Sequence, residues 1–193
     1  NDTKILVYDD DISVAARLWW MLKYIGITNV KILNGGINAA AQAGIEMESG
    51  EPNKSNHLKG KIDARINNDL LIEIDELKTI ISKGKNYILI DSRSPERYKG
   101  LIEPYDKIPG RIPTSINIFF KDVMNENRIK EVEDLKKVYN NIDSDKMVIA
   151  YCGSGVTAPI NIVAMDEVGL YSRLYLGSYS DYVSYKDNVI EKD

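Results

Sequence analysis

The chain has 193 residues, of which 44% are hydrophobic and 28% charged, and its formal net charge is −4. A chain of this length and composition can bury an apolar core of its own. The acidic balance, without any basic tract, argues against a nucleic-acid partner. No uncharged run approaches the roughly 18 residues of a membrane span, so we expect no membrane partner either.

Short apolar runs alternate with amphipathic patterns along the chain. Ser13 and Gly26 are the predicted N-cap and stop of the first helix, and Pro159 suits the first turn of a later one. The strands are predicted at 4–8, 30–33, 86–91, 146–151 and 172–176, and the helices at 13–26, 71–84 and 158–169. This alternation indicates an α/β fold with a central, mostly parallel sheet flanked by helices.

The first and last strand–helix–strand units look alike. Val14 and Val156 occupy corresponding places 142 positions apart, and at that offset Cys152 falls on Asp10. We interpret the units as two copies of one element, a tandem repeat in which only the second copy carries a thiol in its turn. A chance likeness between two unrelated pieces is the alternative.

The repeat predicts three segments: a partial domain at 1–50, a linker at 51–68 that lacks apolar periodicity, and a second domain at 69–193. About 80 residues precede the turn of the second copy, whereas few precede that of the first. We therefore expect the first copy to lack its front half, and expect low activity or association with another chain. The apolar side chains expected to be poorly covered are Leu18, Trp19, Trp20 and Leu22.

The only cysteine, Cys152, follows an apolar strand and opens a loop rich in glycine and hydroxyl groups. Gly153 and Gly155 allow a tight curl, so backbone N–H groups can converge on one point at the start of a helix. An anionic sulfur there would have a lowered pKa and would be exposed and reactive, with Ser154 and Thr157 as hydroxyl donors. A buried cysteine acting as a small hydrophobic residue is the alternative. A single thiol cannot form an internal disulfide, which is typical of a reducing compartment, and we expect a cytoplasmic location.

Several ordered motifs carry a family resemblance. The loop CGSGVTA at 152–158 resembles the active-site loop of two-domain rhodanese-like sulfurtransferases, especially the 3-mercaptopyruvate sulfurtransferases. The start of the family's catalytic domain is similar to LIDSRSPERYKGLIEPYDKIPGRIPTSINIFF, and its closing segment to LYLGSYSDY. The resemblance implies a catalytic rhodanese-like domain at 69–193, preceded by the second half of an inactive duplicate.

The same resemblance implies a reaction. Cys152 would take sulfur from a small-molecule donor as a persulfide and pass it to a thiol or cyanide acceptor, such as a thioredoxin-like protein, without cofactor or metal. Arg97 matches the family's substrate arginine and would pair with a donor carboxylate, a plain surface charge being the alternative. Ser154 matches a serine assigned to proton transfer. The other loop residues expected to line the donor site are Gly153, Gly155, Val156 and Thr157.

Departures from the family pattern affect the donor and the site. Thiosulfate-preferring relatives carry basic residues directly after the cysteine, and the neutral Gly153 and Ser154 here favour 3-mercaptopyruvate. Tyr105 stands where the family often has a second arginine. Arg111 replaces a histidine and is expected to supply the missing charge, with an exposed structural role as the alternative. The only histidine, His57, is predicted to be a solvated linker residue without a catalytic role.

Other enzyme classes fit the sequence poorly. A phosphatase of the same general fold needs an arginine in the loop after Cys152, and none is present up to Ala158. A serine hydrolase would need the G-x-S-x-G elbow, and a phosphate-binding P-loop or a zinc site has no matching motif. The competing function from another class is a non-catalytic rhodanese-like binding or regulatory module.

Overall fold

The computed structural model describes residues 3–50 and 60–193, and its largest element is a five-stranded parallel sheet. Residues 51–59, which include His57 and make up the first half of the predicted linker, lie outside the described residues. The strand order in the sheet is β3-β9-β8-β4-β5. The strands span Leu71–Ile72 (β3), Tyr87–Asp91 (β4), Ile116–Asn117 (β5), Met147–Tyr151 (β8) and Ser172–Tyr175 (β9).

Helices pack on both faces of this sheet, and each face has its own cluster of buried apolar side chains. Along β8, Val148, Ala150 and Cys152 belong to one core cluster, and Ile149 and Tyr151 to another on the opposite face. The first face packs against α5 (Val132–Val138) and α6 (Ala158–Glu167), and the second against α3 (Ile74–Lys83) and α7 (Ser178–Tyr182). Both faces of the parallel sheet are therefore buried, which explains why its strands read as continuous apolar runs.

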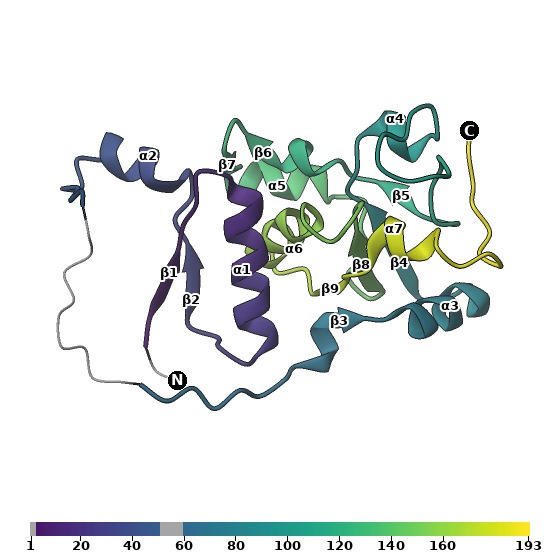
Figure 1. The fold of residues 1–193 in the computed structure, drawn as a ribbon, viewed down its shortest axis with the longest axis horizontal. Helices are drawn as coiled ribbons and strands as arrows, with labels where there is room; N and C mark the ends of the chain where they lie inside the picture. The colour runs from purple at the N-terminus through teal and green to yellow at the C-terminus, as the bar shows by residue number, and fades with distance from the viewer. Residues whose placement is uncertain (1–2, 51–59) are drawn as a thin grey trace.

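The first part of the chain forms a small parallel pair of strands beside a helix. β1 (Ile5–Val7) pairs with β2 (Val30–Ile32), and α1 (Ile12–Tyr24) connects them, followed by α2 (Gly36–Gln42). Figure 1 shows α1 lying between this pair and α6 of the larger sheet. No helix among residues 3–50 and 60–193 is long and apolar enough to cross a membrane.

The helix α1 joins both parts in one apolar core. Trp19 and Trp20 are 6% and 2% exposed and belong to the same core cluster as α6. The expectation that these two side chains would be poorly covered is therefore wrong, because α6 supplies the cover. Leu18, by contrast, is 46% exposed, and Leu22 is half-buried. The described residues thus form one α/β unit around a shared core.

A short hairpin connects the β1–α1–β2 part of the chain to the part that contains the larger sheet. It consists of β6 (Met124–Asn125) and β7 (Arg128–Ile129), after the single turn η2 (Phe120–Val123). The Asn34 side chain accepts a hydrogen bond from the Ile129 N–H at 2.8 Å and donates to its carbonyl at 2.9 Å. Asn34 thereby imitates one step of an antiparallel ladder and fixes the hairpin against the end of β2.

Most predicted elements lie within two residues of the observed ones, with two differences. The first helix begins at Ile12, and its N-cap is Asp11, whose carboxylate accepts from the Ser13 N–H at 2.8 Å. Asp11 takes the place predicted for Ser13 because its carboxylate accepts from the N–H two residues further on, which has no acceptor within the first turn of the helix. Leu71, predicted to start a helix, belongs instead to β3, which pairs with β9 and follows the single turn η1 (Asn68–Leu70).

Candidate active site

The strand β8 places Cys152 at the carboxyl edge of the sheet, in its central position, directly before the loop that leads to α6. Ligand sites of parallel α/β sheets form at this edge. The cysteine is 1% exposed and belongs to the core cluster that contains Ala150 and Val148. The expectation of an exposed sulfur is therefore wrong, because the alternation of β8 turns this side chain toward the core.

The start of α7 covers the cysteine from the side of β9. Ser178 Oγ lies 3.9 Å from Cys152 Sγ and accepts a hydrogen bond from the Cys152 N–H at 3.1 Å. The Tyr179 N–H donates to the Cys152 carbonyl at 3.0 Å, and the Ser180 N–H to the Gly153 carbonyl at 2.9 Å. Three consecutive residues of α7 thus hold both ends of the cysteine's peptide unit.

The loop after the cysteine offers a row of backbone donors. In the part of the chain that the structure describes, no hydrogen bond is donated by the N–H groups of residues 153–157. Gly155 has φ +73°, and a Cβ there would lie 2.4 Å from the Leu176 carbonyl oxygen. Only glycine fits this close approach, and its left-handed conformation helps to form the concave N–H cluster that binds anions.

The hydroxyl side chains of the loop make no hydrogen bond to the sulfur among the described residues. Ser154 is exposed, Val156 and Thr157 are half-buried, and Thr157 is the N-cap residue of α6 without a side-chain capping bond. Among the described residues, the hydrogen bond recorded for Cys152 Sγ comes from Ser178, not from Ser154 or Thr157.

The helix α4 (Pro95–Tyr98) brings Arg97 to the same loop. A Cβ built on Gly153 would lie 3.3 Å from both Nη1 and Nη2 of Arg97, so the guanidinium lies directly against Gly153. Arg97 is 14% exposed and donates to Glu103 through Nε at 3.2 Å and Nη2 at 2.7 Å. Its ion pair with Asp106 is longer, at 3.6 Å. Among the described residues no hydrogen bond uses Nη1 of Arg97, and this nitrogen can receive a ligand oxygen.

A fully buried ion pair lies behind Arg97. Arg93 donates to Asp91 Oδ2 at 2.6 Å, to Glu103 Oε2 at 3.1 Å and to the Gly110 carbonyl at 2.6 Å. Its guanidinium stacks 3.9 Å from the centroid of the Tyr179 ring. Although burial opposes its charge, the hydrogen bond and the attraction to Asp91 raise the pKa of Arg93. Glu103 therefore bridges two arginines and ties Arg97 to the core.

Arg111, the other predicted substrate arginine, makes its contacts elsewhere. Its Nη1 donates to Asp193 at 2.7 Å, its Nε pairs with Glu191 at 3.5 Å, and its guanidinium lies 4.6 Å from the ring of Tyr98. The hydrogen bond to Asp193 raises the pKa of Arg111 against the opposing effect of burial. The structure thus brings Cys152, Gly153 and Arg97 together and engages Arg111 with the last residues of the described chain.

Three residues of this site escaped sequence reasoning, namely Ser178, Glu103 and Asp106. A signal existed for Ser178, because the Gly-Ser-aromatic segment was noted as part of the resemblance. Glu103 and Asp106 also lie in a stretch that carries the resemblance, but their contacts with arginine gave no signal, since an acidic residue in a polar loop reads as solvated. No group of three or more His, Cys, Asp or Glu among the described residues is placed to hold a metal ion.

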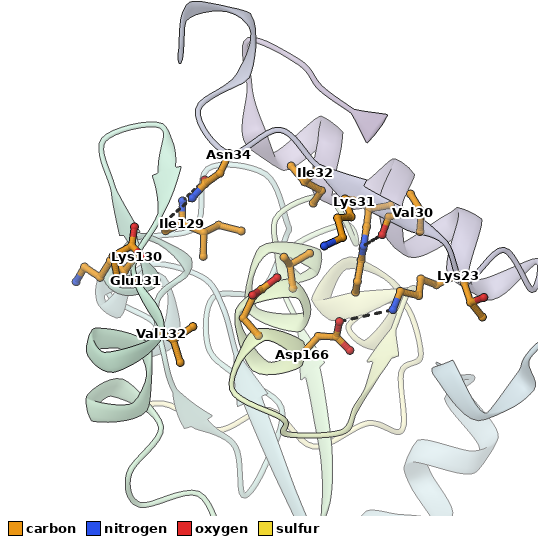
Figure 2. Close-up of a pocket in the computed structure, with 14 residues that line it drawn as sticks. Lys23, Val30, Lys31, Ile32, Asn34, Ile129, Lys130, Glu131, Val132 and Asp166 are labelled. Carbon is orange, nitrogen blue, oxygen red and sulfur yellow. Dashed lines mark hydrogen bonds and ion pairs between the residues drawn. The ribbon is translucent and has the colours of Figure 1, made fainter. Parts of the chain in front are cut away.

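A pocket of about 550 Å³ lies elsewhere, between the first part of the chain and the larger sheet. Figure 2 shows Lys23, Lys31 and Asp166 around it, with the Lys23–Asp166 ion pair at 3.6 Å. Its walls come from α1, β2, β7, α5 and α6 and carry both signs of charge. Cys152 and Arg97 do not line this pocket.

The sheet and its strand-end thiol define the class of protein: an α/β protein with a cysteine at a strand–helix turn and an arginine fork beside it. The sequence signature described as "Rhodanese-like domain" matches residues 1–43 and 73–185. The chain therefore belongs to the rhodanese-like family.

Curated relatives are longer than this chain. It is 33% identical over 189 residues to "Putative thiosulfate sulfurtransferase SseB" of Mycobacterium tuberculosis, covering 95% of this chain and 65% of that protein. It is 26% identical over 197 residues to the 3-mercaptopyruvate sulfurtransferase of Escherichia coli strain K12, covering 99% of this chain and 69% of that protein. The chain thus spans about two thirds of the length of these relatives.

Solved structures share the fold. The crystal structure of SseA from Escherichia coli, titled for the rhodanese fold of 3-mercaptopyruvate sulfotransferases, superposes with a TM-score of 0.76 at 25% identity, over 92% of this chain and 67% of that one. The crystal structure of YnjE superposes with a TM-score of 0.86 at 21% identity, over 99% of this chain and 49% of that one, which supports the fold alone.

Proposed function

We propose that this chain is a sulfurtransferase that carries sulfane sulfur as a persulfide on Cys152. The observation that carries the proposal is the single thiol at the carboxyl end of β8, followed by backbone N–H groups that have no partner among the described residues and flanked by the Arg97 guanidinium. Family membership and the names of the curated relatives support it.

The chemistry has two half-reactions. In the first, the Cys152 thiolate attacks the sulfur of 3-mercaptopyruvate. The S–S bond forms while the donor's C–S bond breaks, leaving its electron pair on carbon as pyruvate enolate, which takes up a proton. In the second, an acceptor thiolate or cyanide attacks the outer sulfur, and the electron pair of the S–S bond returns to Cys152. The N–H groups of the loop would stabilise each sulfur anion.

Arg97 is the proposed anchor of the donor. Its guanidinium lies against Gly153, one residue from the nucleophile, and a donor carboxylate bound to Nη1 would hold the reacting sulfur close to Cys152. Ser154, exposed on the same loop, is the proposed proton donor to the enolate. Because Gly153 and Ser154 bring no positive charge, we propose 3-mercaptopyruvate over thiosulfate as the preferred donor. The geometry of Arg111 favours its structural alternative.

The burial of Cys152 gives weight to a second function, a rhodanese-like module that binds or regulates without catalysis. Sulfur transfer requires a donor to reach this buried sulfur, whereas binding does not. For the domain organisation, we propose that 1–50 descends from the second half of a duplicated unit and that 69–193 is the catalytic one.

Intact-mass measurement separates these functions. The chain is incubated with 3-mercaptopyruvate or with thiosulfate and weighed before and after reduction. We expect a reducible gain of about 32 Da, one sulfur atom, that is absent in Cys152→Ser. If the wild type gains no sulfur from either donor while remaining folded, the binding module becomes the better description.

A pair of arginine variants tests the anchor. Arg97→Lys keeps the charge but loses the planar fork, so we expect KM for 3-mercaptopyruvate to rise about tenfold or more with a smaller change in kcat. Arg111→Lys is the matched control, since Arg111 is equally exposed at 14% and equally ion-paired. Equal effects of the two substitutions would remove Arg97 from the donor site.

A further inference from the structure

Of the described acidic side chains beside Arg97, Asp106 is the one that keeps an oxygen without a hydrogen bond. Its side chain is only 10% exposed, and Oδ2 has no hydrogen-bond partner among the described residues. The ion pair between Oδ2 and Arg97 Nη2 is 3.6 Å long, beyond hydrogen-bonding distance. A buried carboxylate oxygen in this state lowers stability, so the fold alone does not account for Asp106.

Glu103, by comparison, is fully engaged. Its Oε1 accepts from Arg97 Nη2 at 2.7 Å and from the N–H groups of Tyr105 and Asp106 at 3.1 and 3.4 Å. Its Oε2 accepts from Arg93 and Arg97 at 3.1 and 3.2 Å. Glu103 therefore positions Arg97, whereas Asp106 adds a negative charge to the same guanidinium without helping to hold it.

The charges of this cluster do not balance. Three carboxylates, those of Asp91, Glu103 and Asp106, face the two guanidinium groups of Arg93 and Arg97, which leaves one excess negative charge. The loop residues 153–157 contain no basic side chain to offset it. An anion bound to Nη1 of Arg97 over Gly153 would therefore lie close to an uncompensated carboxylate.

We propose that Asp106 is a specificity-determining residue that selects, by charge, which anions reach Cys152. The meaning of this filter for sulfur donors rests on the function proposed above. The repulsion energy from one fixed charge is proportional to the charge of the anion. If Asp106 lowers the binding constant of a monoanion by some factor, it therefore lowers that of a dianion by the square of that factor. Asp106 thus favours a singly charged α-keto carboxylate over the doubly charged thiosulfate.

The kinetic test compares two donors in three proteins. Asp106→Asn keeps the shape of the side chain and removes its charge. We expect kcat/KM to rise about tenfold for thiosulfate and about threefold for 3-mercaptopyruvate, with the difference shrinking as salt is added. Asp134→Asn is the matched control, because it changes the net charge equally on the exposed face of α5, where Asp134 pairs with Lys137 at 2.7 Å.

A second readout needs no sulfur transfer. Cys152 is the only thiol in the chain, so its alkylation by anionic iodoacetate and by neutral iodoacetamide can be followed by intact mass. We expect the ratio of the two rates, iodoacetate over iodoacetamide, to rise about threefold in Asp106→Asn and to stay at the wild-type value in Asp134→Asn.

The two readouts separate the inference from the function it rests on. A raised alkylation ratio without turnover in any variant would keep the charge filter and end the sulfurtransferase proposal. Turnover by the wild type with an unchanged alkylation ratio in Asp106→Asn would keep the sulfurtransferase proposal and overturn the charge filter. Equal gains for both donors, or a thiol that neither reagent modifies in any variant, would also overturn the role of Asp106.

Discussion

The two strand–helix–strand units of this chain, β1–α1–β2–α2 and β8–α6–β9–α7, differ at the turn after their first strand. In the first unit, Asn127 of the hairpin closes the turn: it donates to the Asp10 carbonyl at 2.7 Å and accepts from the Ile12 N–H at 3.2 Å. In the second unit, the N–H groups of residues 153–157 find no partner among the described residues. The same strand–helix turn can therefore stabilise the fold, where a side chain such as Asn127 bonds to it, or leave its N–H groups open to a ligand, where no side chain does.

The units also differ at the start of their short final helix. Gly36 has φ +63°, and a Cβ there would lie 2.4 Å from the Asp9 carbonyl oxygen, so glycine is the residue that fits. Ser178, at the matching place, has φ +58° although it carries a side chain. A left-handed serine is strained, and its hydroxyl is the group that accepts from the Cys152 N–H. We propose that the strain is tolerated for the sake of this contact.

The largest effect is expected from moving the thiol between the turns. Cys152→Ser should abolish the reducible gain of sulfur. Adding Asp10→Cys to that variant should not restore it, because Asn127 already occupies the first turn. Intact mass after donor treatment measures both. A persulfide on residue 10 would show that the turn bonded by Asn127 supports persulfide formation as well as the open turn does, and would contradict the distinction drawn between the two turns.

The buried ion pair behind the second turn should dominate stability. Arg93→Gln leaves Asp91 buried without its charged partner, and we expect a loss of about 3–5 kcal/mol in the free energy of unfolding. Arg17→Gln, on the half-buried side of α1, should change it by less than about 0.5 kcal/mol. Urea unfolding of both variants measures the difference, and equal losses would contradict the assigned role of Arg93.

Opening the first turn should have a smaller cost. Asn127→Ala removes both hydrogen bonds at the start of α1, and we expect a loss of about 1–2 kcal/mol. Hydrogen exchange at the Ile12 N–H should rise with it. The control is Asn140→Ala, at an exposed asparagine outside any helix. No change in exchange at Ile12 would show that the hairpin does not close this turn in solution.

Two substitutions at Ser178 separate strain from contact. Both Ser178→Gly and Ser178→Ala lose the acceptor for the Cys152 N–H, but only glycine relieves the backbone. We therefore expect the glycine variant to be the more stable of the two by about 1 kcal/mol, with sulfur loading of Cys152 impaired in both. Thermal unfolding and intact mass measure these effects, and equal stability would argue against strain at this residue.

A last effect should appear only at alkaline pH. Burial raises the pKa of Tyr179 to about 12, and it also raises the pKa values of Tyr151 and Tyr182 above the ordinary value of 10. The unfolded chain then loses these protons first, so stability is complete below about pH 10 and falls as the pH rises toward about 12. Unfolding free energy against pH, with tyrosinate absorbance, tests this, and a flat profile would contradict it.

The sequence allowed much of the fold to be predicted, because buried parallel strands read as apolar runs. The bounds of β4 and β8 differ from the predicted strands by one residue, and Cys152 follows β8 as expected. The contact of its sulfur and N–H with Ser178 could not be predicted, since Ser178 lies 26 positions further along the chain. The closure of the Asp10 turn by Asn127 spans 117 positions and left no local pattern. The part of the structure that could not be predicted is thus its hydrogen bonds between residues far apart in the sequence.

The attachment of Cys152 to α7 has a consequence for synthesis. The hydroxyl and the N–H groups that hold the cysteine belong to Ser178, Tyr179 and Ser180, all of which follow it in the chain. A nascent polypeptide that has just completed the cysteine loop therefore lacks the residues that fix it. Since domains form progressively during translation, the thiol is left unsecured until β9 and α7 have been made. The order of translation thus delays assembly of the cysteine loop until most of its sheet exists.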